Sequence, residues 1–233
     1  MALNKCYSNN FWRLKSPESL KGYGTRAEWD DSVKSEQIIC PLEDGHRRGG
    51  KRIGNLTVVL NPQKAGDFVW TWYSDCLIQD HVLKLFRQEG FTGFEVKPVT
   101  VKTKKGINIP PLTLWEVVLT GWGGMASPQS GIKLVKQCYS CGLLKYSGFD
   151  NPSKIIDTSL WDGSDFFMVW PLPKFIFVTE RVVSFIKKEK LTGCQLIPVD
   201  KLPLPKSGLG PGRLSHWMPE ERARVLGEPL GIY

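Results

Sequence analysis

The pattern of apolar and polar positions predicts two short amphipathic helices, each flanked by strands. Apolar residues recur at helical spacing over 77–86, after an expected N-cap at Ser74 and before a helix end ahead of Gly90. A second helix with the same kind of apolar face is expected after a cap at Thr179 and as far as about Lys190. Strands are predicted over residues 53–60, 68–73, 94–99, 114–120, 175–178 and 194–199.

The two helices belong to two copies of one sequence pattern. A shift of one hundred residues places Trp70–Val99 on Trp170–Val199 without a gap. The identical positions, numbered in the first copy, are Trp70, Val82, Glu89, Thr92, Gly93, Pro98 and Val99. Gly93 and its counterpart Gly193 are interpreted as left-handed residues that close the helices. We therefore predict an internal duplication that gives two similar strand–helix–strand half-units.

Composition is that of an ordinary globular protein, with 41% hydrophobic and 23% charged residues in a chain of 233. No apolar run approaches the ~20 residues of a membrane span, and the first residues lack the apolar core of a signal peptide. We therefore expect a cytoplasmic protein that does not contact a membrane. A net charge of +8 favours an anionic partner, either nucleic acid or an acidic protein surface.

Cysteine spacing provides the clearest candidate chemistry. Cys138 and Cys141 are separated by two residues, so that one turn can offer two thiolates to a zinc ion. They lie about thirty residues before the second copy, and Cys40 lies at the same distance before the first copy, followed by His46. Because a structural zinc site has four ligands, Cys40 and His46 are candidates to complete it. We predict one structural zinc per chain; a metal-free turn with buried thiols is the alternative.

These observations predict an α+β fold whose two half-units are joined through a zinc-ribbon-like site. Proline and glycine content marks the last segment as an arm, in which residues 219–226 are expected to form a short helix. The first segment has no clear period and is expected to be irregular, with room for one short strand. The expected divisions are an N-terminal leader 1–39, a first half 40–120, a second half 121–200 and a C-terminal arm 201–233.

The run Cys138-Tyr139-Ser140-Cys141-Gly142, together with the downstream segment 161–193, resembles the bacterial double-CXXCG motif family. Some members of that family are immunity proteins that neutralise toxins delivered between cells. The resemblance covers roughly residues 36–200, and the first motif departs from it because Cys40 has no second cysteine at the CXXC spacing. The resemblance implies a non-enzymatic interaction protein that binds a protein toxin, as in toxin–antitoxin pairs.

A basic loop supports a different function. The segment 46–52 carries four fixed positive charges beside the expected metal turn, and such charges can neutralise phosphates. The alternative is therefore a zinc-containing nucleic-acid-binding module that uses Arg47, Arg48, Lys51 and Arg52. Exposed aromatic side chains would favour this hypothesis, whereas burial of Trp70, Trp72 and Trp122 would weaken it.

Catalysis is the third hypothesis, and the sequence gives it little support. The histidines are His46, His81 and His216, and no nucleophile motif accompanies them. The glycine-rich segments match no phosphate-binding loop. We therefore expect a protein that is not an enzyme.

Overall fold

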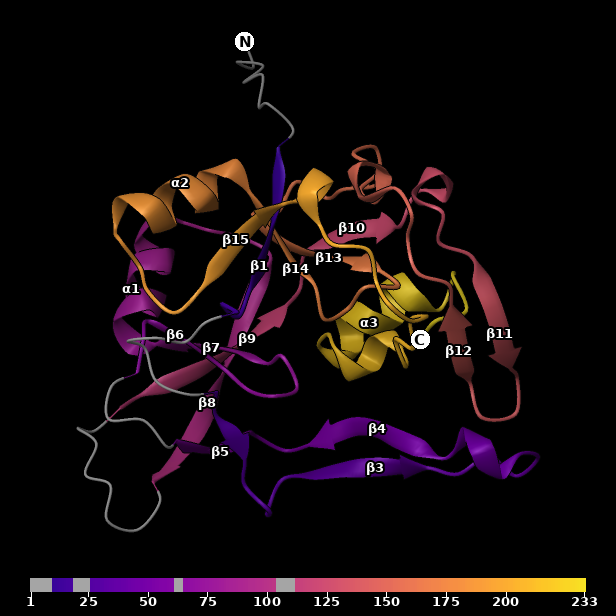
Figure 1. The fold of residues 1–233 in the computed structure, drawn as a ribbon. Coiled ribbons are helices and arrows are strands. Elements are labelled where there is room, and N and C mark those ends of the chain that lie inside the picture. Colours follow the sequence, from indigo (N-terminus) through magenta and orange to yellow (C-terminus); the bar gives the residue numbers. More distant parts are fainter. Residues whose placement is uncertain (1–9, 19–25, 61–64, 104–111) are drawn as a thin grey trace.

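The computed structural model describes residues 10–18, 26–60, 65–103 and 112–233, and over these residues the chain has a mixed α+β fold (Figure 1). Most of its regular structure is β-sheet, and three short α-helices accompany it. None of the helices in this described part of the chain has the length and apolar character that a membrane crossing needs. Parts of the leader, residues 1–9 and 19–25, lie outside the described residues.

The first half of the chain builds a six-stranded sheet, and α1 (Asp80–Gln88) lies between two of its strands in sequence. Its β5 and β8 strands pair in parallel, and the other neighbours are antiparallel. In spatial order the strands are β2 (Glu28–Trp29), β5 (Thr57–Leu60), β8 (Phe94–Thr103), β9 (Leu114–Leu119), β7 (Cys76–Gln79) and β6 (Phe68–Trp70).

The second half builds most of a five-stranded sheet, and α2 (Glu180–Lys188) lies between two of its strands in sequence. In spatial order its strands are β10 (Trp122–Met125), β13 (Phe166–Trp170), β14 (Ile176–Thr179), β1 (Phe11–Lys15) and β15 (Gln195–Pro198). The N-terminal strand β1 is antiparallel to both of its neighbours, β14 and β15. The leader 1–39 was expected to be irregular with room for one short strand, but its described residues form three, at Phe11–Lys15, Glu28–Trp29 and Lys34–Ile38. The first of these is an interior strand of the second sheet.

Two β-hairpins and a C-terminal helix complete the described structure. One hairpin pairs β3 (Lys34–Ile38) with β4 (Arg48–Ile53), and the other pairs β11 (Leu134–Cys138) with β12 (Leu143–Tyr146). The expected C-terminal helix is α3 (Glu220–Gly227), one residue later than predicted. Single 3-10 turns are η1 (Asp44–His46), η2 (Pro128–Ser130), η3 (Pro152–Lys154), η4 (Val199–Lys201) and η5 (Leu214–His216).

The first helix starts later than its sequence pattern predicts. Ser74 has a left-handed φ of 72° in the turn before β7, and it is not an N-cap. Leu77 and Ile78 belong to β7, where both are fully buried. A strand covered on both faces is a continuous apolar run, which sequence periodicity does not separate from a buried helical face. In the second half, α2 starts directly after Thr179 as predicted.

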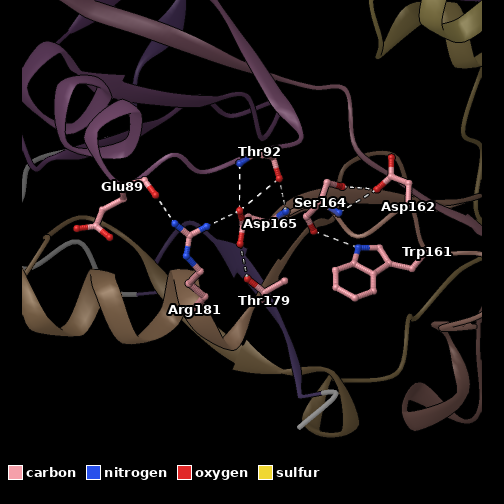
Figure 2. Close-up of polar contacts among 8 residues, drawn as sticks. All are labelled: Glu89, Thr92, Trp161, Asp162, Ser164, Asp165, Thr179 and Arg181. Atoms are coloured by element: carbon pink, nitrogen blue, oxygen red, sulfur yellow. Dashed lines mark hydrogen bonds and ion pairs between the residues drawn. The ribbon is translucent and has the colours of Figure 1, made fainter. Parts of the chain in front are cut away.

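Two similar sets of hydrogen bonds join the halves, each between an aspartate of one half and a threonine of the other. The Asp67 carboxylate accepts hydrogen bonds from the backbone N–H and the hydroxyl of Thr192, both at 2.6 Å. Asp165 accepts the equivalent pair from Thr92, at 3.1 and 3.3 Å, as Figure 2 shows. Arg181 adds an ion pair to Asp165 at 2.8 Å. Each half therefore supplies an aspartate that caps the Thr-Gly turn of the other half.

The shared glycines permit this close contact. Gly93 and Gly193 have φ of 87° and 81°, as expected, but Gly90 and Lys190 are the left-handed residues that directly follow the helices. A Cβ atom on Gly93 would lie 1.9 Å from a carbonyl oxygen of β13, and one on Gly193 would lie 2.2 Å from a carbonyl oxygen of β6. A side chain at either position would separate the turn from the opposite strand.

The core between the halves is aromatic. The helices α1 and α2 lie side by side at one end of the molecule (Figure 1), with the ring centroids of Phe86 and Phe185 6.1 Å apart. Phe166 of β13 packs on Phe86 at 5.4 Å, and both side chains are fully buried. Burial of side chains of this size contributes roughly 1.5–3 kcal/mol each, so this cluster strongly favours the association of the halves.

Candidate metal centre

The four predicted metal ligands lie at the ends of the two hairpins. Cys40 follows β3, and His46 is the last residue of η1, just before β4. Cys138 ends β11, and Cys141 lies in the turn that leads to β12. The strand pairs hold these loops closed, and Figure 1 shows the two hairpin ends next to each other.

The ligand atoms form a compact cluster. The three sulfur atoms and a ring nitrogen of His46 all lie within 4.8 Å of one another. The Cys40 and Cys138 sulfurs are 3.8 Å apart, and the Cys141 sulfur is 3.7 Å from His46 Nδ1. A tetrahedral zinc ion with its usual bond lengths has edges of about 3.8 Å between sulfurs and about 3.6 Å from sulfur to nitrogen. The four residues are therefore placed where they could bind a metal ion.

Polar neighbours orient the cluster. His46 is 4% exposed and turns Nδ1 toward Cys141, while its Nε2 lies 3.1 Å from a carboxylate oxygen of Glu43. That contact is close enough for an ion pair but lies outside hydrogen-bond geometry. A carboxylate behind a ligating histidine is a common arrangement in metal sites, because it fixes the orientation of the ring. Lys136 from the other hairpin holds the same carboxylate at 3.2 Å.

Arg48 binds the CXXC turn directly. Its guanidinium donates hydrogen bonds to the Cys141 sulfur at 3.3 Å and to the Cys141 carbonyl oxygen at 2.7 Å. Burial raises the pKa of the Cys141 thiol, but the hydrogen bonds from Arg48 and the Leu143 backbone outweigh this effect. The net result is a pKa lowered to about 6. For Cys40, burial is the main cause of a raised pKa. Of the Cys40 and Cys141 thiols, that of Cys141 therefore ionises first.

The C-terminal segment closes the other side of the CXXC turn. Gly142 is buried with φ of 67°, and a Cβ atom there would lie 1.8 Å from the Arg213 guanidinium. Arg213 is held in turn by the carbonyl oxygen of Tyr233 at 2.7 Å. The sequence pattern does not single out Glu43 or Arg213 as parts of this site. The glycine after Cys141 is the one signal in the sequence that the turn is approached closely.

The basic loop is largely engaged within the protein. Arg52 pairs with Glu116 and with Asp75, and Lys51 pairs with Glu220 of α3. Arg48 contacts the CXXC turn as described above. Within the described residues, Arg47 is the one basic side chain of this loop for which no polar partner is found.

The aromatic residues of the nucleic-acid hypothesis have mixed positions. Trp70 and Trp122 are buried, at 4% and 8% exposure, and belong to the main core. Trp72 is 62% exposed, with the Arg26 guanidinium 4.9 Å from the ring centre. Two of the three tryptophans are therefore closed to a nucleic acid base, and one is open to solvent.

No family model matches the sequence, and a search of the curated proteins finds no match. The resemblance to the double-CXXCG family therefore stays a prediction, carried by the residues that suggest it. The same holds for the expected partner, for the absence of catalysis and for the compartment. What the structure adds is the geometry of the four-residue cluster.

Proposed function

We propose that the chain is a non-enzymatic interaction protein of the immunity type, which binds and neutralises a protein toxin. We further propose that a structural zinc ion joins its halves in the manner of a zinc ribbon. The immunity role rests on the resemblance of residues 138–142 and 161–193 to the double-CXXCG family, and the zinc ion rests on one observation of the structure. Residues from loops almost a hundred positions apart supply the donor set of a structural zinc site, with ligand atoms within 4.8 Å of one another.

The donor chemistry supports zinc and a structural role. Three thiolates and an imidazole suit a borderline-soft cation, and zinc favours four such ligands in a tetrahedron. A site with four protein ligands has no open position for water or substrate, unlike the usual catalytic zinc site. The ion would then act on stability, by tying the hairpin of the first half to that of the second.

Matching contacts in the two halves support the proposed duplication. The strand–strand–helix–strand order of β6, β7, α1 and β8 recurs in β13, β14, α2 and β15. Asp67 with Thr192 and Asp165 with Thr92 make the same pair of hydrogen bonds in opposite directions. A duplicated unit whose copies pack face to face produces such reciprocal contacts.

Nucleic-acid binding is less well supported. Three of the four basic side chains proposed to meet phosphates already have partners within the protein. Breaking these contacts would cost part of any binding energy, and Arg52 would leave a buried carboxylate unpaired. A net charge of +8 suits an acidic protein surface as well as nucleic acid, so it does not decide between them.

Two experiments test the proposal. Elemental mass spectrometry of protein purified without chelators is expected to find about one zinc per chain, and none in Cys138→Ser with Cys141→Ser. Cys194→Ser is the control, because this thiol lies outside the cluster and should leave the zinc in place.

Co-expression with a panel of antibacterial toxin domains tests the immunity role. Growth rescue against one toxin, lost in the Cys138→Ser, Cys141→Ser variant, is the expected result. Absence of rescue across the panel, combined with salt-dependent binding of an oligonucleotide, would favour the nucleic-acid alternative instead.

A further inference from the structure

Large apolar side chains are exposed at the hairpin ends that hold the candidate metal centre. Tyr139, between the two cysteines of the CXXC turn, is 89% exposed. Leu42, between Cys40 and His46, is 79% exposed, and Ile39 is 66% exposed. Among the described residues, these three and Val135 of β11, at 69%, have the largest exposed fractions of all large apolar side chains. Four exposed apolar residues on two adjoining hairpins are typical of an interaction surface.

The charges around these residues indicate the kind of partner. Arg47, Lys133 and Lys145 lie on the same two hairpins, are exposed, and have no ion-pair partner within the described part of the chain. The comparable acidic residues of these hairpins, exposed and without an ion pair in the described part of the chain, are Glu36 and Asp44, because Glu43 is engaged by Lys136 and His46. The two hairpins thus expose apolar side chains at the ends that hold the candidate metal centre, and they carry an excess of unpaired positive charge.

The candidate metal centre would keep this surface in one conformation. Tyr139 and Leu42 each lie between two ligands in sequence, so a bound ion fixes the backbone on both sides of them. A surface held rigid before binding loses less conformational entropy when a partner docks. This explains why bulky apolar residues are tolerated in turns that would otherwise favour small polar ones.

We propose that Ile39, Leu42, Val135 and Tyr139, with Arg47, Lys133 and Lys145 around them, form the docking surface for a protein partner. The partner carries an apolar patch bordered by acidic residues. This proposal rests on the proposed role as a protein-binding protein and adds the face that is used. The acidic border is favoured over a phosphate backbone because the most exposed side chains of the hairpin ends are apolar and most cations of the basic loop are already engaged within the protein.

A peptide selection tests the surface with probes of defined chemistry. A phage library of random twelve-residue peptides is panned against the zinc-loaded protein, and enriched peptides are synthesised and their dissociation constants measured. Peptides that combine Asp or Glu with aromatic or aliphatic residues are expected. Their affinity should fall about tenfold or more in Leu42→Ser with Tyr139→Ser, and should weaken as salt is added.

Matched variants separate this surface from the rest of the molecule. Leu204→Ser with Val225→Ser removes apolar side chains of 57% and 58% exposure in the C-terminal segment, and should change affinity less than twofold. Lys133→Glu with Lys145→Glu should weaken binding, whereas Lys154→Glu with Lys206→Glu should not. Zinc content and melting temperature, measured for every variant, show whether the fold and the metal centre are retained.

Three outcomes would overturn the proposed docking surface. These are no enriched peptide, peptides whose affinity is unchanged in Leu42→Ser with Tyr139→Ser, and a labelled deoxythymidine 12-mer that binds this surface more tightly than any peptide. If zinc is present and the peptides fail, the surface alone is wrong. If zinc is absent but peptides select as expected, the metal part of the proposed function fails and the surface is retained.

Discussion

Around Cys141, two arginines that the sequence did not indicate as partners of the cysteines contact the CXXC turn. Arg48 donates to the Cys141 sulfur, and Arg213 packs on Gly142 from the opposite side. In the sequence, Arg48 is one of several cations in a basic loop, and its pattern suggests phosphate binding. The structure gives it a different role, since a cation beside a thiol stabilises the thiolate form that binds metal.

Arg48→Gln should weaken zinc binding mainly at low pH. Without the guanidinium, the pKa of Cys141 rises from about 6 toward its ordinary value, and protons then compete with zinc for the sulfur. We expect the variant to lose about a hundredfold in affinity at pH 6 and only a few-fold at pH 8. Competition titrations with a zinc chelator at both pH values measure this.

Arg47→Gln, at the neighbouring exposed position, is the control and should behave like the wild type. An Arg48→Gln defect of equal size at pH 6 and pH 8 would show that Arg48 acts on packing and not on the thiolate.

Gly142→Ala tests the contact between the CXXC turn and the C-terminal segment. The new methyl group would collide with Arg213, and the alanine would have to adopt a left-handed backbone. The free energy of unfolding should therefore fall by about 2–4 kcal/mol. Gly163→Ala is the matched control, because its φ is 84° and its Cβ would meet no atom within 4 Å. It should lose only about 1 kcal/mol.

Chemical denaturation of both variants provides the comparison. Adding Arg213→Ala to Gly142→Ala should recover part of the loss, since the side chain that collides is removed. Equal losses for Gly142→Ala and Gly163→Ala would show that the guanidinium contact carries no steric constraint.

At the scale of elements, the sequence predicted some boundaries well. The second helix was located to its first residue because a polar cap precedes a clear apolar stripe. The sequence pattern places the start of the first helix several residues too early, because Cys76, Leu77 and Ile78 are buried on both faces of β7. The place of β1 between β14 and β15 was not predictable, because strand pairing over more than 160 residues leaves no local pattern.

The reciprocal aspartates join elements of the two halves, and each should matter by a similar amount. Asp67→Ala leaves the N–H and hydroxyl of Thr192 without an acceptor, and Asp165→Ala does the same to Thr92. We expect each variant to lose about 2–3 kcal/mol of unfolding free energy, the cost of unsatisfied polar groups. Denaturant titration measures the loss.

Asp157→Ala provides the control, because this half-buried aspartate caps only its own turn at Ser159. Its loss should stay below about 1 kcal/mol. If Asp67→Ala and Asp165→Ala cost no more than Asp157→Ala, the contacts between the halves do not stabilise the fold.

At the scale of the whole molecule, the candidate metal centre lies between the halves and adds to their other contacts. Among these are the aromatic cluster of Phe86, Phe166 and Phe185 and the aspartate contacts. The clustering of Cys40, His46, Cys138 and Cys141 was predictable because CXXC spacing is specific and the repeat suggested where the other two residues lie. Arg213 was not, because a lone arginine in a Pro/Gly-rich segment carries no such spacing.

Removing the metal should loosen the hairpins and leave the two sheets intact. Because the aromatic core does not depend on the ion, amide hydrogen exchange should accelerate in β3–β4 and β11–β12 on addition of a chelator. Exchange in β13 and β14 should change little. Mass spectrometry of peptides from each element follows both regions, and equal acceleration everywhere would mean that the ion holds the whole fold.

The central claim is that Cys40, His46, Cys138 and Cys141 together bind one zinc ion. X-ray absorption at the zinc edge of the purified protein tests this most directly, because it reports the atoms bonded to the metal. We predict three sulfur neighbours at about 2.3 Å and one nitrogen neighbour at about 2.0 Å. A protein without zinc, or zinc surrounded by oxygen atoms, would contradict it.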